Sequence, residues 1–242
     1  MLGINWSNYP FGAGVASSLV ATLVIFFLAK WKNWIVVGTK KARRSWVLAR
    51  RLDEIGMTEF FASRADYAKY RPSGLLGDYL ATAKHRIDVA GYWMGHGHEA
   101  EAIAHTIVDC LEETPGMSAR IALINPDGPH LGAVAAYLNL GTEEVANRLR
   151  ASLASLTHAR ASATASVRTR LSVLVYNDLP LASVILLDYG TPSARAQLDF
   201  KLFKRPRGES FSFEVAAPSA FYNRCASAWI QVVDHASPYV AP

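Results

Sequence analysis

Hydrophobic and polar positions follow two different periods after residue 73, and together they predict an α/β domain. Apolar residues recur every three or four positions, as in amphipathic helices, over residues 75–85, 100–111, 131–138, 142–157 and 218–233. Alternating or continuous apolar runs, which favour strands, cover residues 86–93, 119–125, 167–176, 182–189 and 197–203. This order predicts a sheet of mixed strands with helices on both faces, a three-layer α/β sandwich.

A further helix is predicted upstream of this domain, over residues 57–70. Thr58 is a candidate N-cap, and Arg71 precedes a proline, a position that disfavours helical backbone. We therefore expect residues 57–72 to form a linker helix and residues 73–242 to form the domain.

The N-terminal pattern differs, because residues 11–29 contain no charged side chain. As a helix this stretch would be about 28 Å long, close to the roughly 30 Å hydrocarbon core of a bilayer. It predicts one transmembrane helix, preceded by a short extracytoplasmic segment at residues 1–10. Within the helix Gly14, Ser18 and Thr22 form a stripe of small residues that would suit self-association.

The charges around this stretch predict its orientation. Residues 30–51 carry eight Lys and Arg and no acidic residue, whereas residues 1–10 carry no charge. The positive-inside bias therefore predicts a single-pass protein of the inner (cytoplasmic) membrane with its N-terminus outside and its domain in the cytoplasm. A cleavable signal peptide would instead carry its positive charge before a shorter apolar core. A buried core helix would not explain the one-sided charge.

Within the basic juxtamembrane segment, residues 30–56, tryptophans alternate with cationic side chains, as is typical of a membrane interface. The residues expected there are Lys30, Trp31, Lys32, Trp34, Lys40, Lys41, Arg43 and Arg44. The whole chain has a net charge of +5, but residues 30–51 hold eight of its 25 Lys and Arg, which leaves the remainder with a charge of −3. The composition thus favours anionic lipid headgroups as a partner and makes no strong case for nucleic acid.

The domain resembles the phospholipase D-like domain over residues 73–235. The resemblance lies in the order of strand 86–93, helix, strand 119–125 and a later strand pair that contains residues 181–188 and ends in Asp188. In that family the signature HxKxxxxD implies a histidine that attacks phosphorus, a lysine that holds phosphate oxygens and an aspartate that supports both.

This chain departs from the signature at its two reactive positions. Asp188 stands where the aspartate belongs, but Leu181 and Ser183 stand where the histidine and lysine belong. Leucine cannot act as a nucleophile, and a serine without a base is a weak one. None of the seven histidines is followed two residues on by lysine. We therefore expect a degenerate domain without catalytic residues or cofactor; in the alternative, an ordinary α/β domain, Asp188 only begins a turn.

Polar residues that follow the predicted strands are candidate ligand-binding residues, because ligands of open α/β sheets gather outside the carboxyl ends of strands. A phosphate-bearing small ligand is expected at His96, His98, Asn125, Asp127, Asp178 and Asp188. With His105, the two histidines could chemically hold zinc or manganese, but their spacing matches no metal motif, and no metal is predicted. Each of these residues is also a common turn or loop residue.

Three functions fit these patterns. The first is a non-catalytic membrane-anchored module that senses a phosphate or nucleotide ligand or a partner protein, as homo-oligomer or with that partner. The resemblance associates such modules with bacterial signalling and anti-phage defence. The second is a membrane-anchored phosphodiesterase or nuclease whose site is assembled across a dimer. The third is a structural anchor subunit of a larger complex.

Overall fold

The computed structural model describes residues 43–63, 76–94, 98–179, 182–205 and 209–240. The chain divides into two units, Met1–Arg51 and Leu52–Pro242, and the domain described below is the second. No helix among the described residues is long and apolar enough to cross a bilayer. The predicted span at residues 11–29 and the segment at residues 1–10 lie outside the described residues.

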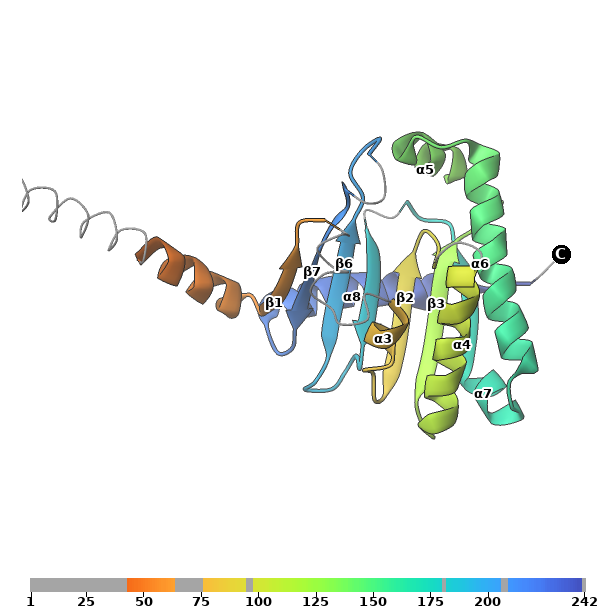
Figure 1. Ribbon diagram of the computed structural model, residues 1–242, viewed down its shortest axis with the longest axis horizontal. Coiled ribbons are helices and arrows are strands. Elements are labelled where there is room, and N and C mark those ends of the chain that lie inside the picture. Colours follow the sequence, from red (N-terminus) through yellow and green to blue (C-terminus); the bar gives the residue numbers. More distant parts are fainter. Residues whose placement is uncertain (1–42, 64–75, 95–97, 180–181, 206–208, 241–242) are drawn as a thin grey trace, which may run out of the picture. The chain divides into compact units, whose positions relative to one another are not determined.

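The described residues of the domain form a sheet of eight strands in the order β1-β7-β6-β5-β2-β3-β4-β8 (Figure 1). Among these described strands, only the β2–β3 and β3–β4 pairs are parallel. The strands are β1 (Met57–Phe61), β2 (Arg86–Gly91), β3 (Ser118–Ile124), β4 (Leu171–Tyr176), β5 (Ser183–Leu187), β6 (Arg195–Phe200), β7 (Phe211–Ala216) and β8 (Ser237–Pro238). The mixed-sheet α/β fold predicted from the sequence is therefore confirmed.

Helices cover both faces of this sheet (Figure 1). Alternate residues of β5 point to opposite faces, so Val184 and Leu186 pack with α8 (Ala220–His235), while Ile185 and Leu187 belong to the larger core on the other side. The helices on that other side include α3 (Leu76–Leu80), α4 (His98–Glu113), α5 (Leu131–Leu138), α6 (Thr142–Ser162) and α7 (Ala165–Arg170).

Cys110 and Cys225 are half-buried free thiols, and burial raises the pKa of both.

The linker helix predicted over residues 57–72 is wrong at its start. Met57–Phe61 are β1, which pairs antiparallel with β7, so these residues belong to the sheet and the domain begins upstream of residue 73. Gly56, with φ of 71°, ends the helical segment before β1, and the Thr58 hydroxyl donates to Glu214 Oε1 at 2.8 Å instead of capping a helix. Residues 64–72 lie outside the described residues.

A second correction concerns the strand predicted over residues 167–176. Its first residues belong to α7, because Thr164 caps that helix by accepting a hydrogen bond from the Val167 amide at 3.4 Å. Only Leu171–Tyr176 are extended. β7 was not among the predicted strands, although Phe211, Phe213 and Val215 alternate along it.

Candidate functional site

A cavity of about 430 Å³ lies on the α3 and α4 side of the sheet, next to the carboxyl end of β2. Its apolar wall includes Val89, Tyr92, Trp93, Met94, Ile103 and Ile185. Its polar wall includes Asp78, Glu99, Ser183, Gln197, Asp199 and Lys201. This mixture of a large apolar surface with a few polar groups is typical of small-molecule sites.

The polar wall comes mainly from β6 and its continuation. Gln197 and Asp199 are two residues apart in β6 and so point to the same face of the sheet, and Lys201 follows directly after the strand ends. Lys201 Nζ forms an ion pair with the Asp199 carboxylate, and its side chain is 9% exposed. Lys201 therefore brings no unpaired positive charge to the cavity.

Ser183 lies in the cavity wall, opposite Asp199 in the β5–β6 register. This is the position where the resemblance places the lysine of the signature. Burial, and to a smaller extent Tyr137 and Asp199, raise the pKa of Tyr92 in the same wall, so its hydroxyl stays protonated. The described wall thus presents hydroxyls, carboxylates, the Gln197 amide and one paired lysine to a ligand.

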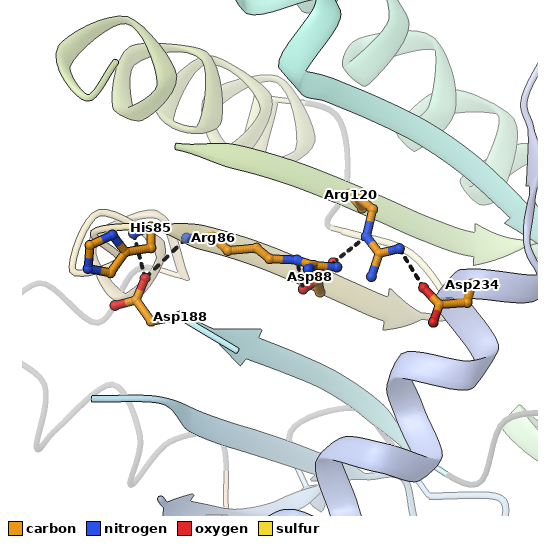
Figure 2. Close-up of polar contacts among 6 residues, drawn as sticks. All are labelled: His85, Arg86, Asp88, Arg120, Asp188 and Asp234. Carbon is orange, nitrogen blue, oxygen red and sulfur yellow. Dashed lines mark hydrogen bonds and ion pairs between the residues drawn. The ribbon is translucent and has the colours of Figure 1, made fainter. Parts of the chain in front are cut away.

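Asp188 is not among the residues that line this cavity. Its carboxylate instead binds the backbone that leads into β2 (Figure 2). Its carboxylate accepts from the backbone amides of Lys84 at 2.9 Å, His85 at 2.6 Å and Arg86 at 3.1 Å. Asp188 is 4% exposed and has a φ of 54°, a conformation that aspartate tolerates better than most residues. The described contacts of Asp188 are therefore structural.

Asn125 and Asp127 come together at the ends of β3 and β4 and are not among the residues that line the cavity. Asn125 donates to Asn177 Oδ1 at 3.1 Å and accepts from the Asp127 amide at 3.0 Å. Arg150 pairs with the Asp127 carboxylate at 2.8 Å. These contacts build a turn, while Asp178 is exposed beside it.

Of the two predicted histidines, the structure describes only His98. His98 is the first residue of α4 and lines the cavity, but its ring is solvent-exposed and lies 3.8 Å from Glu101. His96 lies outside the described residues. Among the residues described, no group of three or more His, Cys, Asp or Glu side chains could hold a metal ion.

Of the predicted membrane-interface residues, only Arg43 and Arg44 are described. Both are exposed on a helical segment over residues 43–54. Lys30, Trp31, Lys32, Trp34, Lys40 and Lys41 lie outside the described residues.

A buried ion network, which the sequence analysis missed, lies on the α8 face of the sheet (Figure 2). The Asp88 side chain is fully buried between Arg86 and Arg120, with both guanidinium Nε atoms 2.6 Å from its oxygens. Arg120 also reaches Asp234 of α8 at 2.6 Å. An aspartate among the apolar residues of β2 is the signal that could have revealed it, since a buried charge requires a partner.

No protein-family model matches the chain, and no curated protein matches its sequence. Solved structures with a similar fold include TrmBL2, an archaeal chromatin protein, with 11% identity over 90% of this chain and 71% of that chain (TM-score 0.44). Another is Nuc, a phospholipase D family member from Salmonella typhimurium, with 10% identity over 68% of this chain and 88% of that chain (TM-score 0.42). A third is phosphatidylserine synthase from Haemophilus influenzae Rd KW20, with 13% identity over 74% of this chain and 39% of that chain (TM-score 0.42). Similarity at this level concerns the fold alone.

Proposed function

We propose that the chain is a membrane-anchored, non-catalytic phospholipase D-like module whose cavity binds a small ligand and whose response occurs at the membrane. The main support for this proposal is the position of Ser183 in the cavity wall, where the signature would place a lysine. Leu181 replaces the nucleophilic histidine in the sequence. The cavity therefore borders Ser183, the position of the replaced lysine, while Leu181 lies outside the described residues.

The size and lining of the cavity support a small ligand. Its volume of about 430 Å³ falls within the roughly 300–1,000 Å³ that is usual for small-molecule sites. Deeply buried apolar residues such as Val89 and Ile103 support its walls, so the cavity does not depend on surface side chains alone. The phosphate-bearing ligand and the signalling or anti-phage role stay predictions.

The ligand proposal can be tested with a substitution that fills the cavity mouth. Ala102 is an exposed residue of α4 that lines the cavity, so Ala102→Trp adds bulk without entering the core. We expect native mass spectrometry of the full chain in nanodiscs to show a small-molecule adduct that Ala102→Trp loses. Ala154→Trp, at an exposed alanine of α6 outside the described cavity wall, should keep the adduct.

The same preparations test the absence of catalysis. We expect hydrolysis of bis(p-nitrophenyl) phosphate to stay at the background rate for the wild-type chain and for Ser183→Ala. Hydrolysis above background that Ser183→Ala abolishes would favour the enzyme instead. An adduct that both tryptophan variants retain would show that the cavity is not the binding site.

The membrane proposal rests on the uncharged residues 11–29 and the basic residues that follow. We expect the full chain to stay with the membrane through an alkaline carbonate wash and a variant lacking residues 11–29 to be released. A C-terminal green fluorescent protein fusion should fluoresce, and a C-terminal alkaline phosphatase fusion should be inactive. An active phosphatase fusion would contradict the proposed cytoplasmic orientation.

A further inference from the structure

We propose that the cavity selects an aromatic or apolar amine, a positively charged ligand with an apolar body, over an anionic or phosphate-bearing one. This inference rests on the proposed function, in that it takes the cavity to be the ligand site. It specifies the chemistry that the described walls recognise.

The first observation is the charge of the described walls. Three carboxylates, those of Asp78, Glu99 and Asp199, face a single lysine, Lys201. Lys201 is already paired with Asp199, and the exposed carboxylate of Asp78 forms no ion pair with any described residue. At Asp78 an anion would meet a like charge, whereas an ammonium group would meet a compensating one.

The second observation is an acceptor that lacks a donor. Gln197 lines the cavity and is 7% exposed, and its Oε1 has no hydrogen-bond partner within the described part of the chain. The terminal torsion of glutamine is soft, so the amide can turn this oxygen toward a donor in the cavity. Because a buried acceptor without a partner is unfavourable, a ligand N–H would be stabilising there. An ammonium group supplies three such donors, whereas a phosphate monoester dianion supplies none and inorganic phosphate at neutral pH only one or two.

The third observation is the extent of the apolar wall around these polar groups. Val89, Tyr92 and Met94 are each 3% exposed, and Ile103 and Ile185 are 4% and 8% exposed. A ligand with a flat or branched apolar body would bury its surface against these side chains. A small inorganic anion would leave this surface without contact.

The test compares two probes that share an indole ring and differ in charge. Binding of tryptamine and of indole-3-acetate to the full chain in nanodiscs is measured by calorimetry, with inorganic phosphate as a competitor. We expect tryptamine to bind at least about tenfold more tightly than indole-3-acetate, and phosphate not to displace it. Gln197→Met, which keeps the volume and removes the acceptor, should weaken tryptamine binding without lowering the melting temperature.

Two matched carboxylate variants distinguish an effect of charge in the cavity from an effect of the protein's overall charge. Asp78→Asn should bring the two affinities closer together, whereas Glu112→Gln, at an exposed position of α4 outside the described wall, should leave their ratio unchanged. Equal or tighter binding of indole-3-acetate, or displacement by phosphate, would overturn the inference. If Ala102→Trp blocks that anionic binding, the proposed function survives. If Ala102→Trp changes the binding of neither probe, both proposals fail.

Discussion

Replacement of Asp188 by alanine is expected to lower the free energy of unfolding by about 3–5 kcal/mol. The carboxylate accepts hydrogen bonds from three successive backbone amides, those of Lys84, His85 and Arg86, and hydrogen bonds to a charged group contribute about 1.5–3 kcal/mol each. Lys84 and His85 are exposed, so water can solvate part of their backbone after the substitution, and the loss of stability falls below the sum of the three hydrogen bonds. Urea unfolding of the full chain, followed by pulse proteolysis, would measure it.

Two further substitutions separate the hydrogen bonds from the backbone conformation of Asp188. Asp188→Asn keeps one neutral acceptor and tolerates the φ of 54°, so we expect about half of the loss. Asp188→Gly removes the side chain but relieves the left-handed conformation and should be slightly less destabilising than alanine. An asparagine variant as stable as the wild type would show that the charge of the carboxylate contributes nothing.

The central part of the fold could be predicted from the sequence, because its elements carry strong local patterns. β2 and β3 are buried over most of their length, as parallel strands covered on both faces should be. The helix α5 was predicted with the same bounds as the structure shows. The edge strands β1 and β8 were missed, because they are short and gain their structure from pairing with the distant β7 and β4.

The cavity could be predicted only in part. His98 was predicted as a ligand residue because it follows a predicted strand, and Ser183 was named only as the replacement for the lysine of the signature; both line the cavity. Gln197 and Asp199 were not predicted as site residues, because two polar residues in an alternating strand are typical of a solvated face. Only the structure shows that residues of α3 and α4 lie across the cavity from them. Asp188 was predicted as a ligand contact, yet the structure shows it bound to backbone amides, which is close to the alternative of a simple turn residue.

The buried network around Asp88 should be the other large contributor to stability. We expect Asp88→Ala to lower the free energy of unfolding by about 3–5 kcal/mol, because it leaves two arginines without their buried counter-charge. Burial acts to lower the pKa of Arg120, but its hydrogen bonds to Asp234 and Asp88 outweigh this and raise it, so the guanidinium stays charged. Burial also raises the pKa of Tyr222, a residue of α8 that is 3% exposed, to about 12.

Two kinds of substitution distinguish the possible roles of this network: one removes a single partner, and the other removes all of the buried charge. Arg86→Met, Asp88→Leu and Arg120→Met together should leave a stability within about 1–2 kcal/mol of the wild type, because apolar residues of similar volume fill the space without a desolvated charge. Asp234→Asn, at a side chain that is 53% exposed, should cost less than about 1 kcal/mol. Urea unfolding of all the variants of the full chain would measure these differences.

If Asp88→Ala were as mild as Asp234→Asn, the network would not stabilise the fold. If the triple variant were as unstable as Asp88→Ala, the ion pairs themselves, rather than the cost of an unpaired charge, would hold α8 against the sheet.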